Sequence, residues 1–154
     1  MFVIGINTGL KTTDLLNLKF CNLLYKELVP KEYIEVSGKN YFINCSIEMA
    51  LYEYLFDIDE EDILNRYVFK SRNGSNPIER CQAYRILNDA STKAGLNLKI
   101  GTETMRKTFG YHFYKEFRDI KYLQTLFNHS SPNVTLDYIG IKEKGMQDYK
   151  NFNL

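Results

Sequence analysis

The sequence predicts a mainly α-helical domain with a small antiparallel β-sheet, an α+β fold, and two patterns support this class. Apolar residues recur at helical spacing in several stretches, whereas two adjacent runs of aromatic and β-branched residues occur only in residues 32–45. The length of 154 residues, 44% of them hydrophobic, suits one globular domain with an ordinary core. We therefore expect a single domain over residues 1–154.

The first expected element is a short helix that begins near Thr12, because hydroxyl and acidic residues precede a group of leucines. The β-hairpin follows, with Ser37-Gly38-Lys39-Asn40 as the link between its strands. Ser46 is expected to cap the next helix. The remaining helices are expected over residues 46–56, 78–94, 102–117, 119–127 and 133–138.

The helical spacing also predicts which side chains are buried. Ile47, Leu51, Tyr54 and Leu55 are expected to face inward, as is the aromatic stripe of Phe109, Phe113 and Phe117. The acidic run 57–62 is expected to be a solvated loop, and residues 71–77 a turn.

Charge is unevenly distributed along the chain. The formal net charge is only +1, which gives no general argument for a polyanionic partner. Residues 66–107, however, hold nine basic and three acidic residues, a local net charge of +6. This segregation predicts a positive face, although a solvated helix surface is the commoner meaning of such a count.

Several classes of protein are excluded by composition. The chain has no apolar run long enough to span a membrane and no signal peptide pattern at its N-terminus, so we expect a cytoplasmic protein. Its three cysteines are far apart and have no histidine at metal-ligand spacing. We expect reduced thiols and no metal site.

Three segments, taken together, resemble the catalytic domain of the tyrosine recombinase, or phage integrase, family. Residues 8–19 (TGLKTTDLLNLK) are similar to the family's T-G-L-R box, and residues 101–112 (GTETMRKTFGYH) to its H-x-x-R box. Residues 126–140 (LFNHSSPNVTLDYIG) are similar to the L-x-x-H-S-S stretch that leads to the nucleophilic tyrosine. Each box is weak alone, but their order and spacing make the combination specific.

The resemblance implies a chemistry and a set of site residues. A tyrosine attacks a DNA phosphodiester and forms a 3′-phosphotyrosyl link, while arginines stabilise charge on the phosphate oxygens. A histidine can exchange the tyrosine proton, and a hairpin lysine can protonate the leaving 5′ oxygen. Three positions match this pattern: Tyr138 as nucleophile, Arg106 as the second arginine and His129 as the downstream histidine.

Three other positions depart from the pattern. Lys11 stands where the family has its first arginine, and Glu103 stands where it has the histidine of H-x-x-R. Val36 occupies the usual place of the hairpin lysine, and Lys39 is the nearest substitute. We therefore expect weak or absent cleavage, since loss of one positioned donor to a transition-state oxyanion costs about 3 kcal/mol.

The resemblance further implies double-stranded DNA as partner, a homo-oligomer on DNA, no cofactor and a bacterial or phage origin. Because it begins at the first residues, we expect only the catalytic domain, without the family's N-terminal core-binding domain. Two alternatives remain open: a DNA-binding or recombination-modulating remnant that does not cleave, and a helical protein-interaction domain without a DNA role. The basic residues expected to contact DNA are Arg72, Arg80, Arg85 and Lys107.

Overall fold

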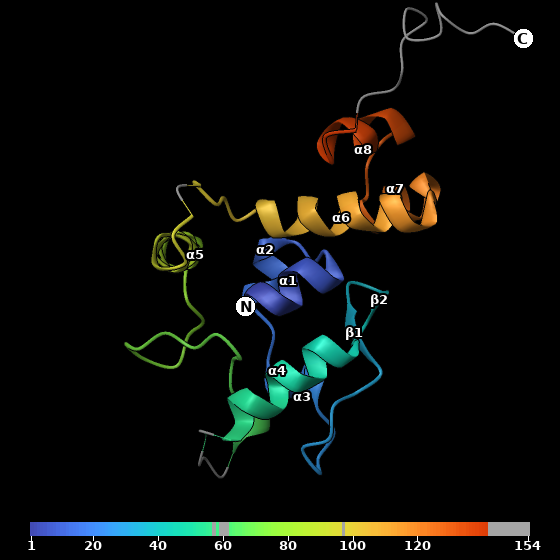
Figure 1. Ribbon diagram of the computed structural model, residues 1–154. Coiled ribbons are helices and arrows are strands. Elements are labelled where there is room, and N and C mark those ends of the chain that lie inside the picture. Colours follow the sequence, from blue (N-terminus) through green and yellow to red (C-terminus); the bar gives the residue numbers. More distant parts are fainter. Residues whose placement is uncertain (57, 59–61, 97, 142–154) are drawn as a thin grey trace, which may run out of the picture. The chain divides into compact units, whose positions relative to one another are not determined.

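The computed structural model describes residues 1–56, 58, 62–96 and 98–141, and Figure 1 shows the order of its helices and strands. The chain divides into two compact units, Met1–Phe109 and Gly110 onward. The first unit holds α1 (Phe2–Thr8), α2 (Thr12–Leu16), α3 (Phe20–Leu23), β1 (Tyr33–Val36), β2 (Lys39–Phe42), α4 (Cys45–Phe56), the 3₁₀-helix η1 (Ile63–Asn65) and α5 (Arg80–Lys93). Helix α6 (Thr104–Phe117) begins in the first unit, and α7 (Ile120–Phe127) and α8 (Pro132–Tyr138) belong to the second. The α+β prediction is confirmed.

Two short helices of the first unit, α1 and α3, were not expected from the sequence. Helix α1 contains Gly5 and several β-branched residues, which have low helix propensity. Packing against Met105 of α6 stabilises it instead: a Cβ atom on Gly5 would lie only 2.7 Å from the Met105 sulfur, so a larger residue there would have to displace that side chain. Tertiary contacts therefore override local preference at α1.

The hairpin is present, but its turn is shorter than expected. Strands β1 and β2 pair so that Val36 lies opposite Lys39, and only Ser37 and Gly38 form the link. Both link residues have positive φ, 52° and 72°, which matches the twist of a two-residue hairpin. Lys39 is therefore the first residue of β2 rather than part of the turn.

Helix α4 begins one residue earlier than expected, and Ser46 does not cap it. The cap is Asn44, whose side-chain oxygen accepts a hydrogen bond from the Ile47 amide at 3.1 Å. Ile47 is buried as expected. Tyr54 is 43% exposed and is not a core residue as expected, although its hydroxyl donates to the carbonyl of buried Val68 at 3.2 Å.

The other expected helices are confirmed, with one correction to the aromatic stripe. Helix α5 ends before Gly95, which has φ of 73°. In the second unit, Phe113 stacks on Tyr122 at 4.9 Å between ring centroids and contacts Phe117 in a tilted arrangement at 4.8 Å. Phe117 is 65% exposed and is not a core residue, because α6 ends there. Most of the acidic run 57–62 lies outside the described residues.

In the second unit, both short helices begin at side-chain caps. Asp119 accepts a hydrogen bond from the Tyr122 amide at 2.9 Å, and Ser131 accepts one from the Val134 amide at 3.3 Å. Pro132 follows at the first helical position, where its missing N–H costs nothing. These caps fix the chain between α7 and α8, which carries the His-Ser-Ser sequence.

Gly110 provides a first testable prediction, on stability. A Cβ atom at this position would lie 2.7 Å from Ile139 and 2.8 Å from Phe127, both buried. We expect Gly110→Ala to lower the free energy of unfolding by about 1–2 kcal/mol, because overpacking outweighs the gain in helix propensity of about 1 kcal/mol. Urea unfolding measures this change. Gly101→Ala is the matched control, since its Cβ would meet only the Thr104 hydroxyl at 3.6 Å; equal effects at both glycines would contradict the prediction.

Candidate functional site

The first part of the candidate site is the turn that joins α1 to α2. The Thr8 hydroxyl donates to the Ile4 carbonyl at 2.7 Å and accepts from the Leu10 amide at 3.3 Å, which ends α1. Gly9 follows with φ of 66°, and a Cβ there would lie 2.4 Å from the Phe109 ring. Thr-Gly in this box is thus required by backbone conformation and by close packing on α6.

Arg106 ties this turn to α6. It is buried, with 4% of its surface exposed, and its guanidinium donates to the carbonyl of Gly9. A buried arginine needs such partners, because an uncompensated charge away from water is costly. The guanidinium therefore lies next to the turn that leads to Lys11, two residues beyond Gly9.

A second hydrogen bond joins the same two segments. The Thr12 hydroxyl donates to the Thr102 carbonyl at 3.0 Å, and both threonines are buried. The Thr102 hydroxyl in turn accepts from Nε of Arg80 at 3.0 Å. The first box and the H-x-x-R-like box are thus brought together within the first unit, and α5 contributes a third side chain to the cluster.

Glu103 faces that third side chain. Its carboxylate lies 3.4 Å from the Arg80 guanidinium, and the two side chains are 44% and 62% exposed. A pair as exposed as this contributes no more than about 1 kcal/mol to stability. Its importance is electrostatic: Arg80 partly compensates the negative charge of Glu103, which precedes Arg106 by three residues.

The two lysines of the candidate set lie elsewhere in the first unit. Lys11 is exposed and immediately precedes α2. Lys39 is directly opposite Val36 in the hairpin. Opposite residues in an antiparallel pair point to the same face, so Lys39 emerges on the face where the family lysine would lie. This placement favours Lys39 as its substitute.

The second unit brings His129 and Tyr138 together. Their rings pack edge to face with centroids 5.0 Å apart, and the Phe127 ring contacts both, at 5.5 Å from His129 and 5.6 Å from Tyr138. The backbone of His129 is held by Gln124, whose carbonyl accepts from the His129 amide at 3.0 Å and whose side chain donates to the His129 carbonyl at 3.2 Å. The side chains of His129 and Tyr138 are both half-buried, so each has a fixed position and access to solvent.

The His129 ring has a further partner that sequence reasoning missed. Its Nδ1 lies 3.1 Å from the hydroxyl of Thr135, which is fully buried in α8. The hydroxyl is also 3.2 Å from the Ser131 carbonyl. Helical spacing places Thr135 one turn before Tyr138, and that spacing was the only signal from which the sequence could have indicated the contact.

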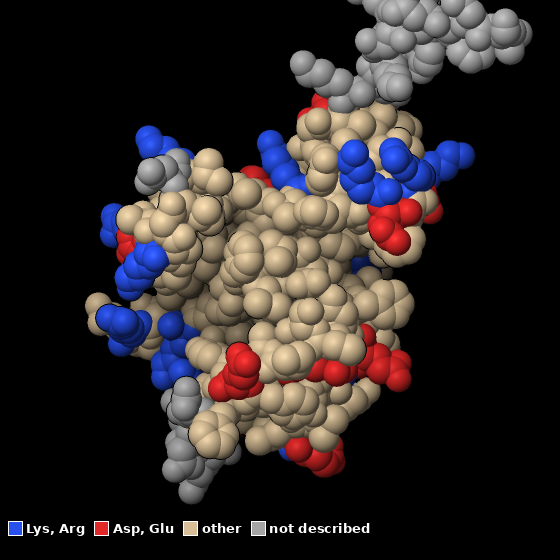
Figure 2. Space-filling model, viewed as in Figure 1, with Lys and Arg blue, Asp and Glu red and all other residues tan. Residues whose placement is uncertain are grey.

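A basic groove runs beside α5 in the first unit. It has a volume of about 500 Å³, and Lys70, Arg72 and Arg85 contribute its basic side chains. Figure 2 shows blue basic side chains gathered over α5, whereas red acidic ones gather over α4. Of the other expected DNA contacts, Arg80 pairs with Glu103, and Lys107 is exposed on α6. Neither lines the groove.

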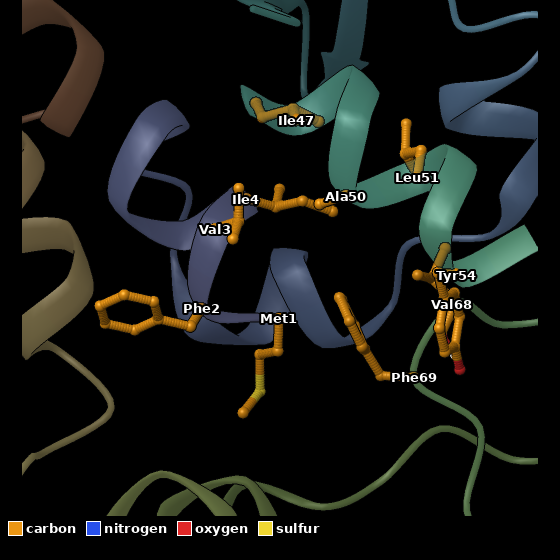
Figure 3. A pocket seen from close by; sticks show the side chains of 10 residues that line it. All are labelled: Met1, Phe2, Val3, Ile4, Ile47, Ala50, Leu51, Tyr54, Val68 and Phe69. Carbon is orange, nitrogen blue, oxygen red and sulfur yellow. The ribbon is translucent and has the colours of Figure 1, made fainter. Parts of the chain in front are cut away.

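An apolar cavity of about 300 Å³ lies between α1 and α4 in the first unit, as Figure 3 shows. Its lining includes Phe2, Ile47 and Phe69. The α-amino group of Met1 is at its edge, and burial lowers the pKa of this amine to about 6. The cavity lining contains no acidic or basic side chain, so we assign it no part in the chemistry.

In the part of the chain that the structure describes, no helix is long and apolar enough to cross a membrane. Among residues 1–56, 58, 62–96 and 98–141, no group of three or more histidine, cysteine or acidic side chains is close enough to hold a metal ion.

Comparison with known proteins identifies the family of this chain. A sequence model described as "Phage integrase family" matches residues 1–144. The chain is 44% identical to a probable integrase/recombinase of Bacillus subtilis (strain 168), YoeC, over 93% of this chain and 77% of that protein. It is 26% identical to the tyrosine recombinase XerD of Listeria monocytogenes (strain F2365), over 95% of this chain and 51% of that protein. The chain belongs to the phage integrase family of tyrosine recombinases.

Solved structures agree on the fold. The XerA recombinase matches with a TM-score of 0.71 and 22% identity, over 92% of this chain and 50% of that one. The Tn1549 transposon integrase, solved with circular intermediate DNA, matches with a TM-score of 0.68 and 18% identity, over 97% and 54%. The chain thus spans about half the length of these proteins and of XerD, and about three quarters of YoeC.

Proposed function

We propose that the chain is the catalytic portion of a tyrosine recombinase and that Tyr138 is its nucleophile. The observation that carries this proposal is the packing of Tyr138 against His129, with 5.0 Å between ring centroids. A phenol needs a base to become a good nucleophile near neutral pH, and an imidazole is the side chain suited to exchange its proton there. The H-S-S turn and α8 bring these two groups side by side.

The proposed step exchanges one phosphoester bond for another and needs no cofactor. The Tyr138 oxygen attacks the phosphorus of a DNA phosphodiester and forms a 3′-phosphotyrosyl bond as the bond to the 5′ oxygen breaks. The phenol proton passes to His129, and the leaving 5′ oxygen takes a proton from Lys39. Attack by a 5′ hydroxyl on the phosphotyrosine reverses the step and rejoins a strand.

Arg106 and Lys11 are proposed to bind the nonbridging oxygens of the same phosphate. The Gly9 turn supports this role, because it brings the segment bearing Lys11 to the Arg106 guanidinium. Arginine binds phosphate through a planar fork, whereas lysine acts as a point charge. Lys11 therefore supplies charge with less geometric control than an arginine would.

Glu103 is expected to weaken this site. A carboxylate beside the phosphate repels it, and Arg80, at 3.4 Å from the carboxylate, reduces but does not remove that repulsion. We propose slow cleavage. Retention of His129 beside Tyr138 favours slow cleavage over a remnant that only binds DNA, and family membership disfavours a protein-interaction domain without a DNA role.

The proposed partner is double-stranded DNA, bound by a homo-oligomer in a bacterial or phage-infected cytoplasm. The basic groove supports DNA as partner, as does the Tn1549 integrase, which was solved with DNA. We further propose that residues 1–154 act as one catalytic domain and need a second DNA-binding domain to enclose the duplex, as the greater length of the relatives suggests.

A cleavage assay tests the proposal without knowledge of the target site. The chain is incubated at low salt with a pool of nicked duplexes of random sequence, in which a cleaved short strand diffuses away and leaves a covalent adduct. We expect adducts that resist denaturant and carry DNA on Tyr138, identified by peptide mass. DNA binding without any adduct would instead support the remnant that does not cleave.

The groove beside α5 predicts a salt dependence of DNA binding. Affinity for duplex should fall steeply as salt rises, and Arg72→Ala with Arg85→Ala should reduce the slope of log K against log salt by about 2, since each phosphate contact contributes about 0.9. Fluorescence anisotropy with a labelled duplex measures the slope. Lys26→Ala with Lys115→Ala removes the same charge from exposed positions outside the groove and should leave the slope nearly unchanged. Equal slopes for the two pairs would refute the groove as DNA contact.

A further inference from the structure

Thr135 occupies an unusual position between two partners. Its hydroxyl oxygen lies 3.2 Å from the Ser131 carbonyl, four residues earlier, and 3.1 Å from Nδ1 of His129. The Thr135 side chain is fully buried, whereas the His129 ring is half-buried. Both distances are within hydrogen-bond range.

A count of protons assigns the direction of each bond. A threonine hydroxyl has one proton, and a carbonyl oxygen can only accept. For both contacts to be hydrogen bonds, the hydroxyl must donate to the Ser131 carbonyl, which also accepts from the Thr135 amide at 3.3 Å, and its oxygen must accept from His129. Nδ1 of His129 must then carry a proton, and in the neutral ring the lone pair lies on Nε2.

We propose that Thr135 is a positioning residue that fixes His129 in the tautomer with the proton on Nδ1. Neutral histidine in water prefers the opposite tautomer, with the proton on Nε2, so the contact reverses the ordinary preference. The lone pair on Nε2 is what the ring needs to accept the phenol proton of Tyr138. This functional meaning rests on the proposed function, whereas the tautomer itself does not.

Ring packing adds to the effect of the hydrogen bond. The Phe127 and Tyr138 rings contact the imidazole at 5.5 and 5.0 Å between centroids, at steep angles of 64° and 69°. A ring held in this way by neighbours and by one nitrogen has a fixed orientation. Thr135, one turn before Tyr138 on α8, thus couples the orientation of the base to the helix that carries the nucleophile.

Nitrogen NMR of the full chain, labelled at histidine, tests the tautomer directly. Proton-coupled ¹⁵N shifts distinguish a ring nitrogen that carries a proton from one that does not, in a buffer where the ring is neutral. His112 is the only other histidine and is exposed on α6, so it serves as an internal reference. We expect the proton on Nδ1 in His129 and the ordinary preference in His112.

Three variants make the test specific. Thr135→Val has nearly the same shape but no hydroxyl, and should shift His129 to the tautomer with the proton on Nε2. Thr135→Ser keeps the hydroxyl and should retain the Nδ1 tautomer. Thr92→Val is the matched control, because Thr92 makes the same kind of bond to the carbonyl four residues earlier, on α5. A His129 proton on Nε2 in the unaltered chain, or no change in Thr135→Val, would overturn the proposal.

Adduct formation on the nicked pool gives the second measurement. Thr135→Val should slow it about tenfold or more, and Thr135→Ser should restore most of the rate. If the tautomer shifts and the rate does not, Thr135 does not position the base and the proposal is wrong. If no variant forms an adduct, the proposed function fails, while the NMR result still decides the tautomer.

Discussion

Tyr138→Phe should abolish the covalent protein–DNA adduct while leaving the fold and DNA binding intact. Phenylalanine keeps the ring that packs on His129 and Phe127 but lacks the attacking oxygen. The expected loss is complete rather than partial, because no other group can replace a nucleophile that becomes part of the product. Adducts are measured by denaturing gel on the nicked pool, and binding by anisotropy on an intact duplex.

The control for this prediction is another tyrosine of the same unit. Tyr122 on α7 stacks on Phe113 at 4.9 Å and is half exposed, so Tyr122→Phe makes the same chemical change at a position outside the proposed site. This variant should form adducts at the rate of the unaltered chain. An adduct that persists in Tyr138→Phe would show that a different residue attacks the phosphate.

The sequence predicts the fold class and the second unit of this protein better than it predicts the details of the first. The expected helices over residues 119–127 and 133–138 follow from local spacing, and the structure has α7 and α8 there, each begun by a side-chain cap. Helix α1 depends on the approach of Met105 to Gly5, a contact between residues a hundred positions apart that no local pattern contains. The Asn44 cap was missed because two neighbouring residues, Asn44 and Ser46, have suitable side chains.

The candidate site shows the same division. Motif resemblance indicated His129 and Tyr138, and the structure places their rings in contact. Motif resemblance could not indicate Thr135, because the role of its hydroxyl depends on two distances at once, to the His129 imidazole and to the Ser131 carbonyl. Nor could it show that Arg80 faces Glu103, since α5 and the segment before α6 meet only in the folded chain.

Replacing Lys11 and Glu103 by the residues typical of the family should speed cleavage. Lys11→Arg should add a bidentate fork for the phosphate, and Glu103→His should remove a repulsive carboxylate and supply a group that titrates near neutral pH. Each change alters one phosphoryl transition state, so their effects couple. We expect the double variant to form adducts up to about a hundredfold faster than the unaltered chain, and faster than either single variant.

Saturating DNA at low salt keeps differences in affinity from obscuring the chemistry, and adduct per unit time is the quantity measured. Glu103→Gln separates the two contributions of the histidine, because it removes the negative charge and adds no titrating group. If removal of repulsion is what matters, Glu103→Gln should recover most of the gain of Glu103→His. Arg80→Ala should lower the rate of the unaltered chain and have a smaller effect once Glu103 is replaced, since the charge that Arg80 compensates is then gone.

A double variant that binds the duplex but cleaves no faster would show that Lys11 and Glu103 do not limit the site. The missing hairpin lysine would then be the next departure to test, with Val36→Lys as the variant, since Val36 lies opposite Lys39 in the hairpin.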